Sequence, residues 1–291
     1  MSVSSASLAR RRIRAAAVAG TFYPARRGEL QSMVRRLLNE AAASRSGPYD
    51  VPASRRSLAA PKALIAPHAG YVYSGPVAAS AFARVEPLRD RVRRVVLVGP
   101  SHFVPFHGIA TSGASAFATP LGDVEIDHEA EAALTEELPC VRVVATAHHR
   151  EHCLEVELPF LQQTLGAFRI VPLVVGDAST DDVARALDLL WGGEDTLIVV
   201  SSDLSHYLDY RAAQLLDSAT SRSIEGLDGE TIGPDQACGA ISIRGLLSVA
   251  ARRGLAATTL DLRNSGDTAG PRDAVVGYGA WALALPSAAL A

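Results

Sequence analysis

The sequence predicts an α/β protein, a single domain with a mainly parallel or mixed central sheet flanked by helices. Continuous β-branched runs such as RRVVLVGPSH and TLIVVSSDLSH are typical of strands that are covered on both faces. These runs alternate with helical patterns, which is typical of parallel strands joined by helical crossovers. The chain has neither an internal repeat nor a clear domain boundary. We therefore expect residues 10–291 to form one domain, preceded by a disordered tail at residues 1–9.

The N-terminal part of the domain begins with a helix. Residues 28–43 place leucine, methionine and valine at helical spacing, with arginines on the other face, which predicts a surface helix. Residues 44–60 are rich in Ser, Pro and Arg, and we expect them to form a loop.

Strand-like and helical segments then alternate to the end of the chain. Short apolar runs predict strands at 63–66, 94–99, 108–111, 141–145, 170–175, 196–200 and 274–283. Helical spacing predicts helices at 75–84, 128–138, 153–165, 180–190, 210–226 and 237–253.

The composition is that of an ordinary globular protein and excludes a disordered or fibrous chain. Of 291 residues, 48% are hydrophobic and 20% are charged. The chain has 28 Lys and Arg residues and 31 Asp and Glu residues. Because positive charge is not in excess, we expect no binding to nucleic acid or to anionic membranes. No apolar run has the roughly 18–20 residues needed to span a bilayer. Three widely spaced cysteines without a CxxC pair argue against a disulfide framework, so we expect a cytoplasmic protein.

Three of the predicted strands end in polar residues of the kind that bind ligands. The run ALIAPHAGY leads to His68, VVLVGPSHF leads to His102, and LIVVSSDLSHY leads to Asp203 and His206. In open α/β sheets, ligands bind in the crevice beyond the carboxyl ends of the strands. Each histidine alone could be structural, but three of them at strand ends predict one shared site.

Imidazoles with one anionic ligand are the donor set of zinc, copper and non-haem Fe(II) centres. Cys238 stands where a loop enters an apolar helix, and a helix N-terminus favours the thiolate form that binds metal. The alternative is that Cys238 is a small buried residue at a tight glycine turn. Cys140 and Cys153 lack this setting, and we expect both to be structural.

The segment HHREHCLE, residues 148–155, is dense in ligand-type side chains and opens a predicted helix. His152 and Glu155 are three residues apart, so we expect them to share a helical face, either in the site or in a capping and supporting role. His107 and His128 have no comparable context and are expected to be surface residues. Neither a Walker P-loop nor a strand–GxGxxG–helix unit is present, so nucleotide chemistry has no support.

A set of ordered motifs resembles one known family. The motifs are VAGTFYP (18–24), APHAGY (66–71) with YSG (73–75), GPSH (99–102), EHCLE (151–155) with LPF (158–160), SDLSHY (202–207) and CG (238–239). Together they resemble the Memo family, whose bacterial members are called AmmeMemoRadiSam system protein B. The resemblance implies a single α/β domain similar to the class III extradiol dioxygenases, which are non-haem iron enzymes.

The resemblance also implies roles for individual residues. His68, His102 and Cys238 correspond to metal ligands, with Asp203 and His206 beside them. We expect His206 to act as a general acid/base and Asp203 to orient either His206 or a metal-bound water. Four further residues are expected to line the pocket or support the ligands: His152, Glu155, Tyr71 and Ser101.

Two classes of function follow from this site. One is a metal-dependent, dioxygenase-like or other redox enzyme, with Fe(II) as the expected cofactor and Cu or Zn as alternatives. Extradiol enzymes use a carboxylate where this family has a cysteine, and a thiolate would make the metal more electron-rich. The other is a non-catalytic adaptor that binds a small molecule or a phosphorylated peptide in the same pocket. The family context implies a functional link to an Ammecr-like protein and a radical SAM enzyme.

Overall fold

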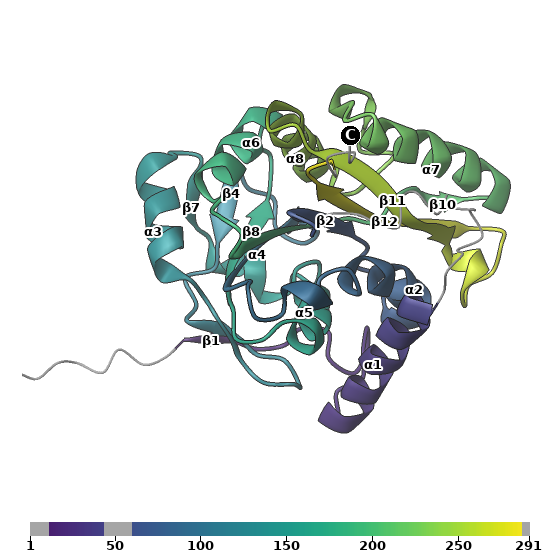
Figure 1. Cartoon of the computed structure of the whole chain (residues 1–291), viewed down its shortest axis with the longest axis horizontal. Helices are drawn as coiled ribbons and strands as arrows, with labels where there is room; N and C mark the ends of the chain where they lie inside the picture. The colour runs from purple at the N-terminus through teal and green to yellow at the C-terminus, as the bar shows by residue number, and fades with distance from the viewer. Residues whose placement is uncertain (1–11, 44–59, 287–291) are drawn as a thin grey trace, which may run out of the picture.

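A mixed β-sheet with helices on both faces forms the centre of the protein (Figure 1). The computed structural model describes residues 12–43 and 60–286. The expected tail at 1–9 and nearly all of the expected loop at 44–60 lie outside these described residues. The α/β class with a mixed sheet, predicted from the strand and helix patterns, is confirmed.

Four parallel strands make up the middle of the sheet. They are, in spatial order, β2 (Ala63–Ala66), β9 (Thr196–Ser201), β3 (Arg94–Pro100) and β8 (Arg169–Val175). Antiparallel pairing begins on both sides of this group. On one side β4 (Ile109–Thr111) pairs with β8, and β7 (Val141–Val143) continues parallel to β4. On the other side β12 (Val275–Ala284) pairs with β2, and β10 (His206–Leu208) and β11 (Ala256–Asn264) pair with β12.

The parallel strands are buried on both faces because alternate residues enter two separate apolar cores. Leu64 and Leu97 belong to one core, with residues of α1 (Arg27–Ala43), α2 (Tyr71–Phe82) and α5 (Leu158–Thr164). Ile65 and Val96 belong to the other, with α3 (His128–Glu137), α6 (Thr180–Leu189) and α8 (Ala240–Arg252). In Figure 1 the first helix group lies below the sheet, and α6 and α8 lie above it. This double coverage explains the continuous apolar runs of these strands.

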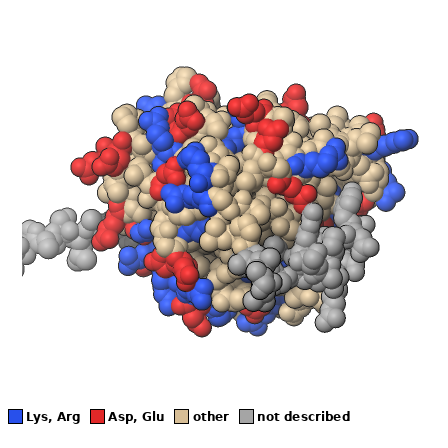
Figure 2. All heavy atoms as spheres, turned by 45° about the horizontal axis from the view of Figure 1, so that its top comes forward, with Lys and Arg blue, Asp and Glu red and all other residues tan. Residues whose placement is uncertain are grey.

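The remaining elements lie around this core. Helix α7 (Tyr210–Glu225) packs against β11 and β12, and α4 (Ala145–His149) packs beside β4. A small second sheet joins β1 (Ile13–Arg14), β5 (Ala116–Phe117) and β6 (Val124–Glu125). Short 3-10 turns occur at Glu86–Leu88, Glu155–Glu157, Gly229–Thr231 and Ser265–Asp267. On the face shown in Figure 2, acidic and basic side chains are interspersed.

Three predicted helices differ from the observed ones by more than one residue at an end, and the one expected at 237–253 begins three residues later, as α8. The helix expected at 75–84 starts earlier, at Tyr71, because the Tyr73 and Ser74 amides donate to the Gly70 carbonyl. The helix expected at 153–165 is divided into the turn Glu155–Glu157 and α5. Pro159 occupies the first turn of α5, where its missing N–H costs no hydrogen bond.

Five strands of the described residues were not predicted: the short strands β1, β5, β6 and β10, and the long strand β11. The last strand was expected at 274–283 and is found one residue later as β12, but its hairpin partner β11 was missed. A register shift between Thr259 and Asp261 breaks the two-residue period that would have marked β11 as a strand. Among residues 12–43 and 60–286, none of the helices is both long and apolar enough to cross a bilayer.

Candidate metal centre

Three neighbouring parallel strands deliver the site. His68 follows β2, Asp203 follows β9 and His102 follows β3, and these strands are adjacent in the order β2, β9, β3. Their carboxyl ends therefore meet at one edge of the sheet. The His68 and His102 rings are 5.1 Å apart between centroids and meet edge to face. The two histidines thus share one site.

His68 is the deepest member of the site and is neutral. Its ring Nδ1 lies 2.8 Å from the Ser201 hydroxyl oxygen. That hydroxyl is also 2.7 Å from the Cys153 carbonyl and 2.7 Å from a Glu157 carboxyl oxygen. Because the serine proton goes to one of these oxygens, Ser201 accepts from His68 Nδ1–H. The lone pair is then on Nε2, which faces the site. Burial, with a smaller effect of His102, lowers the pKa of His68 to about 3.

A single carboxylate holds His102. The Glu151 oxygens accept from the His102 backbone N–H at 2.7 Å and from its ring Nδ1–H at 2.8 Å. Burial would raise the pKa of Glu151, but the hydrogen bonds and charge of His102 outweigh it and lower that pKa to about 2. Ser101 secures the same loop, because its hydroxyl donates to the Val104 carbonyl at 2.7 Å. The Nε2 of His102 is left free for a ligand.

Cys238 completes the group from a distant part of the chain. Its Sγ lies 3.3 Å from His68 Nε2, although 170 residues separate the two. The Cys238 amide donates to the Asp203 carbonyl, and the Gly239 amide donates to the Ser202 hydroxyl at 2.9 Å. A Cβ on Gly239 would lie 2.8 Å from the Ser202 Cβ, so the turn needs glycine to approach β9 this closely.

The expected thiolate character of Cys238 is not found. Cys238 precedes α8 by two residues, but burial and a nearby carboxylate affect its pKa more than the helix N-terminus does. Burial, together with the Asp203 carboxylate, raises the pKa of the Cys238 thiol to about 12. The free thiol is therefore protonated at neutral pH, and a bound metal ion would be needed to deprotonate it.

The three donor groups lie close enough together to be candidate ligands of one transition-metal ion. Ligand atoms of His68, His102 and Cys238 all lie within 4.8 Å of one another. With metal–nitrogen and metal–sulfur bonds of about 2.0 and 2.3 Å, two such donors on one ion are at most about 4.3 Å apart. The 3.3 Å between Cys238 Sγ and His68 Nε2 is within that limit. His68 is buried while His102 and Cys238 are partly exposed, so the group is open on one side.

His152 forms a wall of this site. Its ring stacks on His102 at 4.6 Å between centroids and packs against Phe22 at 4.8 Å. Burial, followed by the effects of His68 and His102, lowers its pKa to about 4, so His152 is neutral. His152, Glu151 and His102 also form a second group of nearby donors. Since Glu151 already bonds His102 Nδ1, we assign this carboxylate to orienting the ring.

Asp203 lies in the loop after β9 and His206 is the first residue of β10, and the expected hydrogen bond between them is not found among the described residues. An Asp203 carboxyl oxygen accepts from the His68 backbone N–H at 2.8 Å, and burial raises the pKa of Asp203. The ring Nδ1 of His206 lies 2.8 Å from the Leu204 carbonyl instead. A carbonyl only accepts, so Nδ1 carries a proton, and no hydrogen bond from the described residues reaches Nε2. The Leu204 backbone, rather than Asp203, therefore sets the His206 tautomer.

Glu155 lies beneath the site and anchors the N-terminal segment. The expected shared helical face with His152 is absent, because the helix begins only after residue 154. The fully buried Glu155 carboxylate accepts from the guanidinium of Arg14 and the hydroxyl of Tyr23. It also accepts from the amides of Ala17 and Val18 at 2.7 and 3.0 Å.

Tyr71 is also a core residue of this region. Its hydroxyl donates to the Val156 carbonyl at 2.6 Å, and its ring packs on Phe160 at 4.9 Å.

Two important supporting residues, Glu151 and Ser201, were missed from the sequence. Both are adjacent to residues that were singled out, within EHCLE and SSDLSH, but spacing along the chain does not reveal which histidine each one contacts. The same applies to Glu157, which is buried beside Ser201 and whose pKa burial raises well above its usual range. One oxygen of Glu157 has no hydrogen-bond partner among the described residues.

Large apolar side chains are exposed in the segments that follow the site histidines. Val72 and Tyr73 come shortly after His68, Phe103 follows His102 and Tyr207 follows His206. Tyr207 is 78% exposed and has a φ of 61°, a left-handed conformation that is uncommon for an aromatic residue. We refer to these four residues as the apolar rim.

Comparisons with known proteins agree with the motifs. A family model described as Memo-like protein matches residues 14–282. A MEMO1 family protein of Ignicoccus hospitalis is 36% identical, over 94% of this chain and 99% of the relative. MEMO1 family proteins of Thermotoga neapolitana and Nitrosopumilus maritimus are 34% and 31% identical, over 91% and 92% of this chain and 98% of each relative. The resemblance found from the motifs is confirmed, and the chain belongs to the Memo family.

Proposed function

We propose that this protein is a metal-dependent redox enzyme that binds one Fe(II) ion through His68, His102 and Cys238. The observation that supports it is the convergence of three donor atoms whose surroundings are already arranged. Ser201 and Glu151 take the Nδ1–H groups of the two histidines, so both Nε2 lone pairs are presented to the site.

Iron is favoured by the number and kind of donors. Two imidazoles and one anionic ligand with open positions are the donor set of non-haem Fe(II) oxygenases, and we propose a likeness to class III extradiol enzymes on this basis. A bound Fe(II) ion supplies redox chemistry toward O₂. Copper and zinc also accept imidazole and thiolate ligands, so metal analysis has to distinguish the three.

We assign proton transfer to His206. Its Nδ1–H is held by the Leu204 carbonyl, so Nε2 of the neutral ring accepts a proton from a substrate hydroxyl. The apolar rim supports an aromatic or otherwise apolar substrate, because desolvating such a substrate against Tyr73, Phe103 and Tyr207 is favourable. Phenolic compounds combine an apolar ring with a hydroxyl that His206 could deprotonate.

The apolar rim also supports a second candidate function. Exposed apolar side chains around a cleft are a feature of protein-binding surfaces, so an adaptor that binds a small molecule or a phosphorylated peptide without turnover is the alternative. We propose a cytoplasmic location, since free cysteines, including a metal-binding one, suit a reducing compartment. A functional link to an Ammecr-like protein and a radical SAM enzyme is part of the same proposal.

Oxygen consumption tests the enzyme proposal. Protein purified without oxygen and loaded with Fe(II) is mixed with catechol or a substituted catechol as the probe. We expect O₂ uptake by the loaded wild type and none by the metal-free protein. His206→Ala should keep its metal and lose about 10²–10⁴-fold in rate, because it lacks the proton acceptor. His128→Ala, an exposed histidine on α3, is the matched control and should behave like the wild type.

The outcome also separates the two candidate functions. Loaded protein that consumes no O₂ with any probe, yet binds a phosphotyrosine peptide, would favour the adaptor. Equal uptake by the wild type and His206→Ala would remove His206 from the mechanism.

A further inference from the structure

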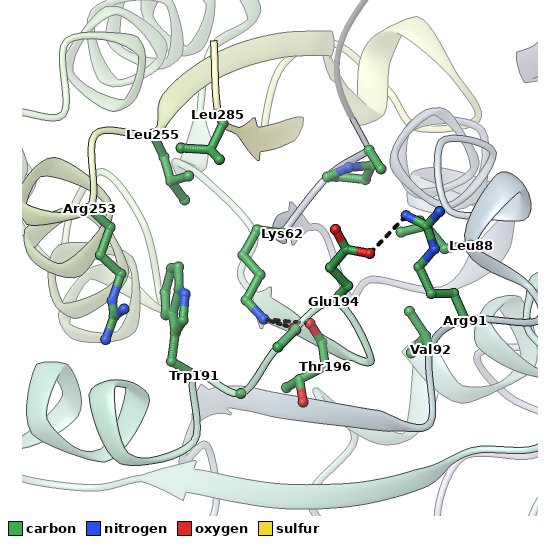
Figure 3. Close-up of a pocket in the computed structure, with 14 residues that line it drawn as sticks. Lys62, Leu88, Arg91, Val92, Trp191, Glu194, Thr196, Arg253, Leu255 and Leu285 are labelled. Atoms are coloured by element: carbon green, nitrogen blue, oxygen red, sulfur yellow. Dashed lines mark hydrogen bonds and ion pairs between the residues drawn. The ribbon is translucent and has the colours of Figure 1, made fainter. Parts of the chain in front are cut away.

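A cavity of about 720 Å³ lies at the opposite end of the sheet from the metal centre (Figure 3). Lys62 directly precedes β2, and Thr196 is the first residue of β9, so the cavity is at the amino ends of the strands that deliver His68 and Asp203. Its volume is within the range of about 300–1,000 Å³ that is typical of small-molecule sites. The proposed redox function does not use it.

Lys62 is the central polar group of this cavity and the single lysine of the chain. Its ammonium donates to the carbonyls of Gly193 and Thr196, both at 2.7 Å. Hydrogen bonds within the described residues thus use two of its three N–H donors. Burial lowers the pKa of Lys62 to about 8, against the opposing effect of Asp195, so the side chain is mainly charged at neutral pH.

The charges around the cavity are mainly positive. Three basic residues, Lys62, Arg91 and Arg253, line it together with one acidic residue, Glu194. Arg91 is paired with Glu194 at 3.4 Å, and in Figure 3 Glu194 lies between Lys62 and Arg91. Arg253 stacks on Trp191 at 4.5 Å, with Trp191 between it and Lys62. Arg253 is also paired with Asp188 at 2.9 Å. Among the described residues the Lys62 ammonium is hydrogen-bonded only to carbonyls, so it is the basic group of the lining that has no carboxylate hydrogen-bonded to it and one N–H left for a ligand.

The rest of the lining is largely apolar. Leu255 and Leu285 lie together on one side in Figure 3, while Leu88 and Val92 lie on the side of Arg91. A ligand that fits has an apolar body and one negative group. A cation would be repelled by the Lys62 charge, and a group with several negative charges would be repelled by the Glu194 carboxylate in the lining.

We propose that this cavity binds a small monoanionic amphiphile, a carboxylate with an apolar body, whose carboxylate contacts Lys62 and whose body lies along the leucine side chains. The charge-assisted hydrogen bond to Lys62 gives specificity for the head group. Burial of the apolar body provides most of the binding free energy. The proposal is independent of the metal centre and of the proposed function.

Calorimetric titration of the full chain with decanoate tests the proposal. Decanol has the same chain with a neutral head, and decyltrimethylammonium has a cationic head. We expect decanoate to saturate one site, decanol to bind at least tenfold more weakly, and the cation not to bind. Lys62→Met should weaken decanoate binding at least tenfold. Arg211→Met, which removes an exposed positive charge from α7, is the matched control and should leave binding unchanged.

A second measurement uses the wild type alone, in case Lys62→Met disturbs folding. Because Lys62 is the single lysine, acetylation by an N-hydroxysuccinimide ester is read at one peptide by mass spectrometry. Saturating decanoate should slow this acetylation at least tenfold, whereas decyltrimethylammonium should not. Equal affinities for decanoate and decanol, or an acetylation rate that decanoate leaves unchanged, would overturn the proposal.

Discussion

Glu151 determines how His102 faces the metal centre. Besides its two bonds to His102, one of its oxygens accepts from the amides of His152 at 3.0 Å and Cys153 at 3.2 Å. One carboxylate thus organises the whole loop through four N–H groups. A glutamine would turn an amide NH₂ toward some of these donors.

We therefore expect Glu151→Gln to lower metal affinity about 10–100-fold, the usual effect of losing an orienting partner of a metal-binding histidine. Competition with a chelator measures this affinity. The matched control is Glu136→Gln, which changes an exposed glutamate on α3 and should have no effect. An unchanged affinity in Glu151→Gln would mean that the His102 ring is held by its packing alone.

Glu155 has a structural rather than a ligand role. It is fully buried, and all the groups that it binds are hydrogen-bond donors from the N-terminal segment. Glu155→Gln places an amide donor among them and leaves the Arg14 charge unpaired. We expect it to lower the free energy of unfolding by about 3 kcal/mol or more, as when a buried ion pair loses one partner.

Urea unfolding, followed by circular dichroism, measures the effect of Glu155→Gln, again with Glu136→Gln as the control. A loss of less than about 1 kcal/mol would be typical of an exposed ion pair and would contradict this role.

At the scale of elements, α3 carries a pH-dependent contribution to stability. Glu131 is on its buried face, and one of its carboxyl oxygens has no hydrogen-bond partner among the described residues. Burial raises the pKa of Glu131 from 4.5 to about 7 in the folded protein. The folded state therefore binds this proton more tightly than the unfolded state. The contribution of protonated Glu131 to the free energy of unfolding is complete below pH 4.5 and is lost as the pH rises through about 7.

We expect Glu131→Gln to have a melting temperature close to that of the wild type at pH 5. At pH 8 the variant should melt a few degrees higher, because the wild type then buries a charge and the variant does not. Thermal unfolding at both pH values, with Glu136→Gln as the reference, checks this. A variant that is less stable than the wild type at pH 8 would show that the Glu131 charge has a favourable partner.

The elements differ in how well the sequence predicts them. Strands β3 and β9 were located to within a residue because both faces are buried and their apolar runs are continuous. Strand β11 was missed because its register shift disrupts alternation, and its burial follows neither a helical nor a strand period. The sequence predicted one helix at 153–165 where the structure has a 3-10 turn followed by α5. The apolar spacing continues across the turn at Glu155–Glu157, so the pattern does not show the division.

At the scale of the whole molecule, the site was only partly predictable. The convergence of His68 and His102 follows from parallel strands that end at one edge, which the sequence pattern indicates. The position of Cys238 depends on the packing of α8 against the sheet. Its place before a predicted helix made it a candidate, and the motif resemblance implied its role as a ligand. Hydrogen bonds such as those of Ser201 and Glu151 arise from tertiary contacts between segments far apart in the chain, so no local pattern predicts them.

The hydrogen bond expected between Asp203 and His206 is not found among the described residues, for a related reason. A spacing of three residues after a strand places both side chains near the site, but it does not fix the backbone of the loop. Here the loop turns so that the His206 ring meets the Leu204 carbonyl, while Asp203 faces the His68 amide.

The metal content of the protein purified without oxygen tests the central claim most directly. Elemental analysis should give one transition-metal ion per wild-type chain, with iron predominant. His68→Ala and Cys238→Ser should lose the metal on dialysis, because two remaining ligands do not hold it. His107→Ala and Cys140→Ser, which change a histidine and a cysteine away from the centre, should keep it. Full metal content in both His68→Ala and Cys238→Ser would contradict the assigned ligand set.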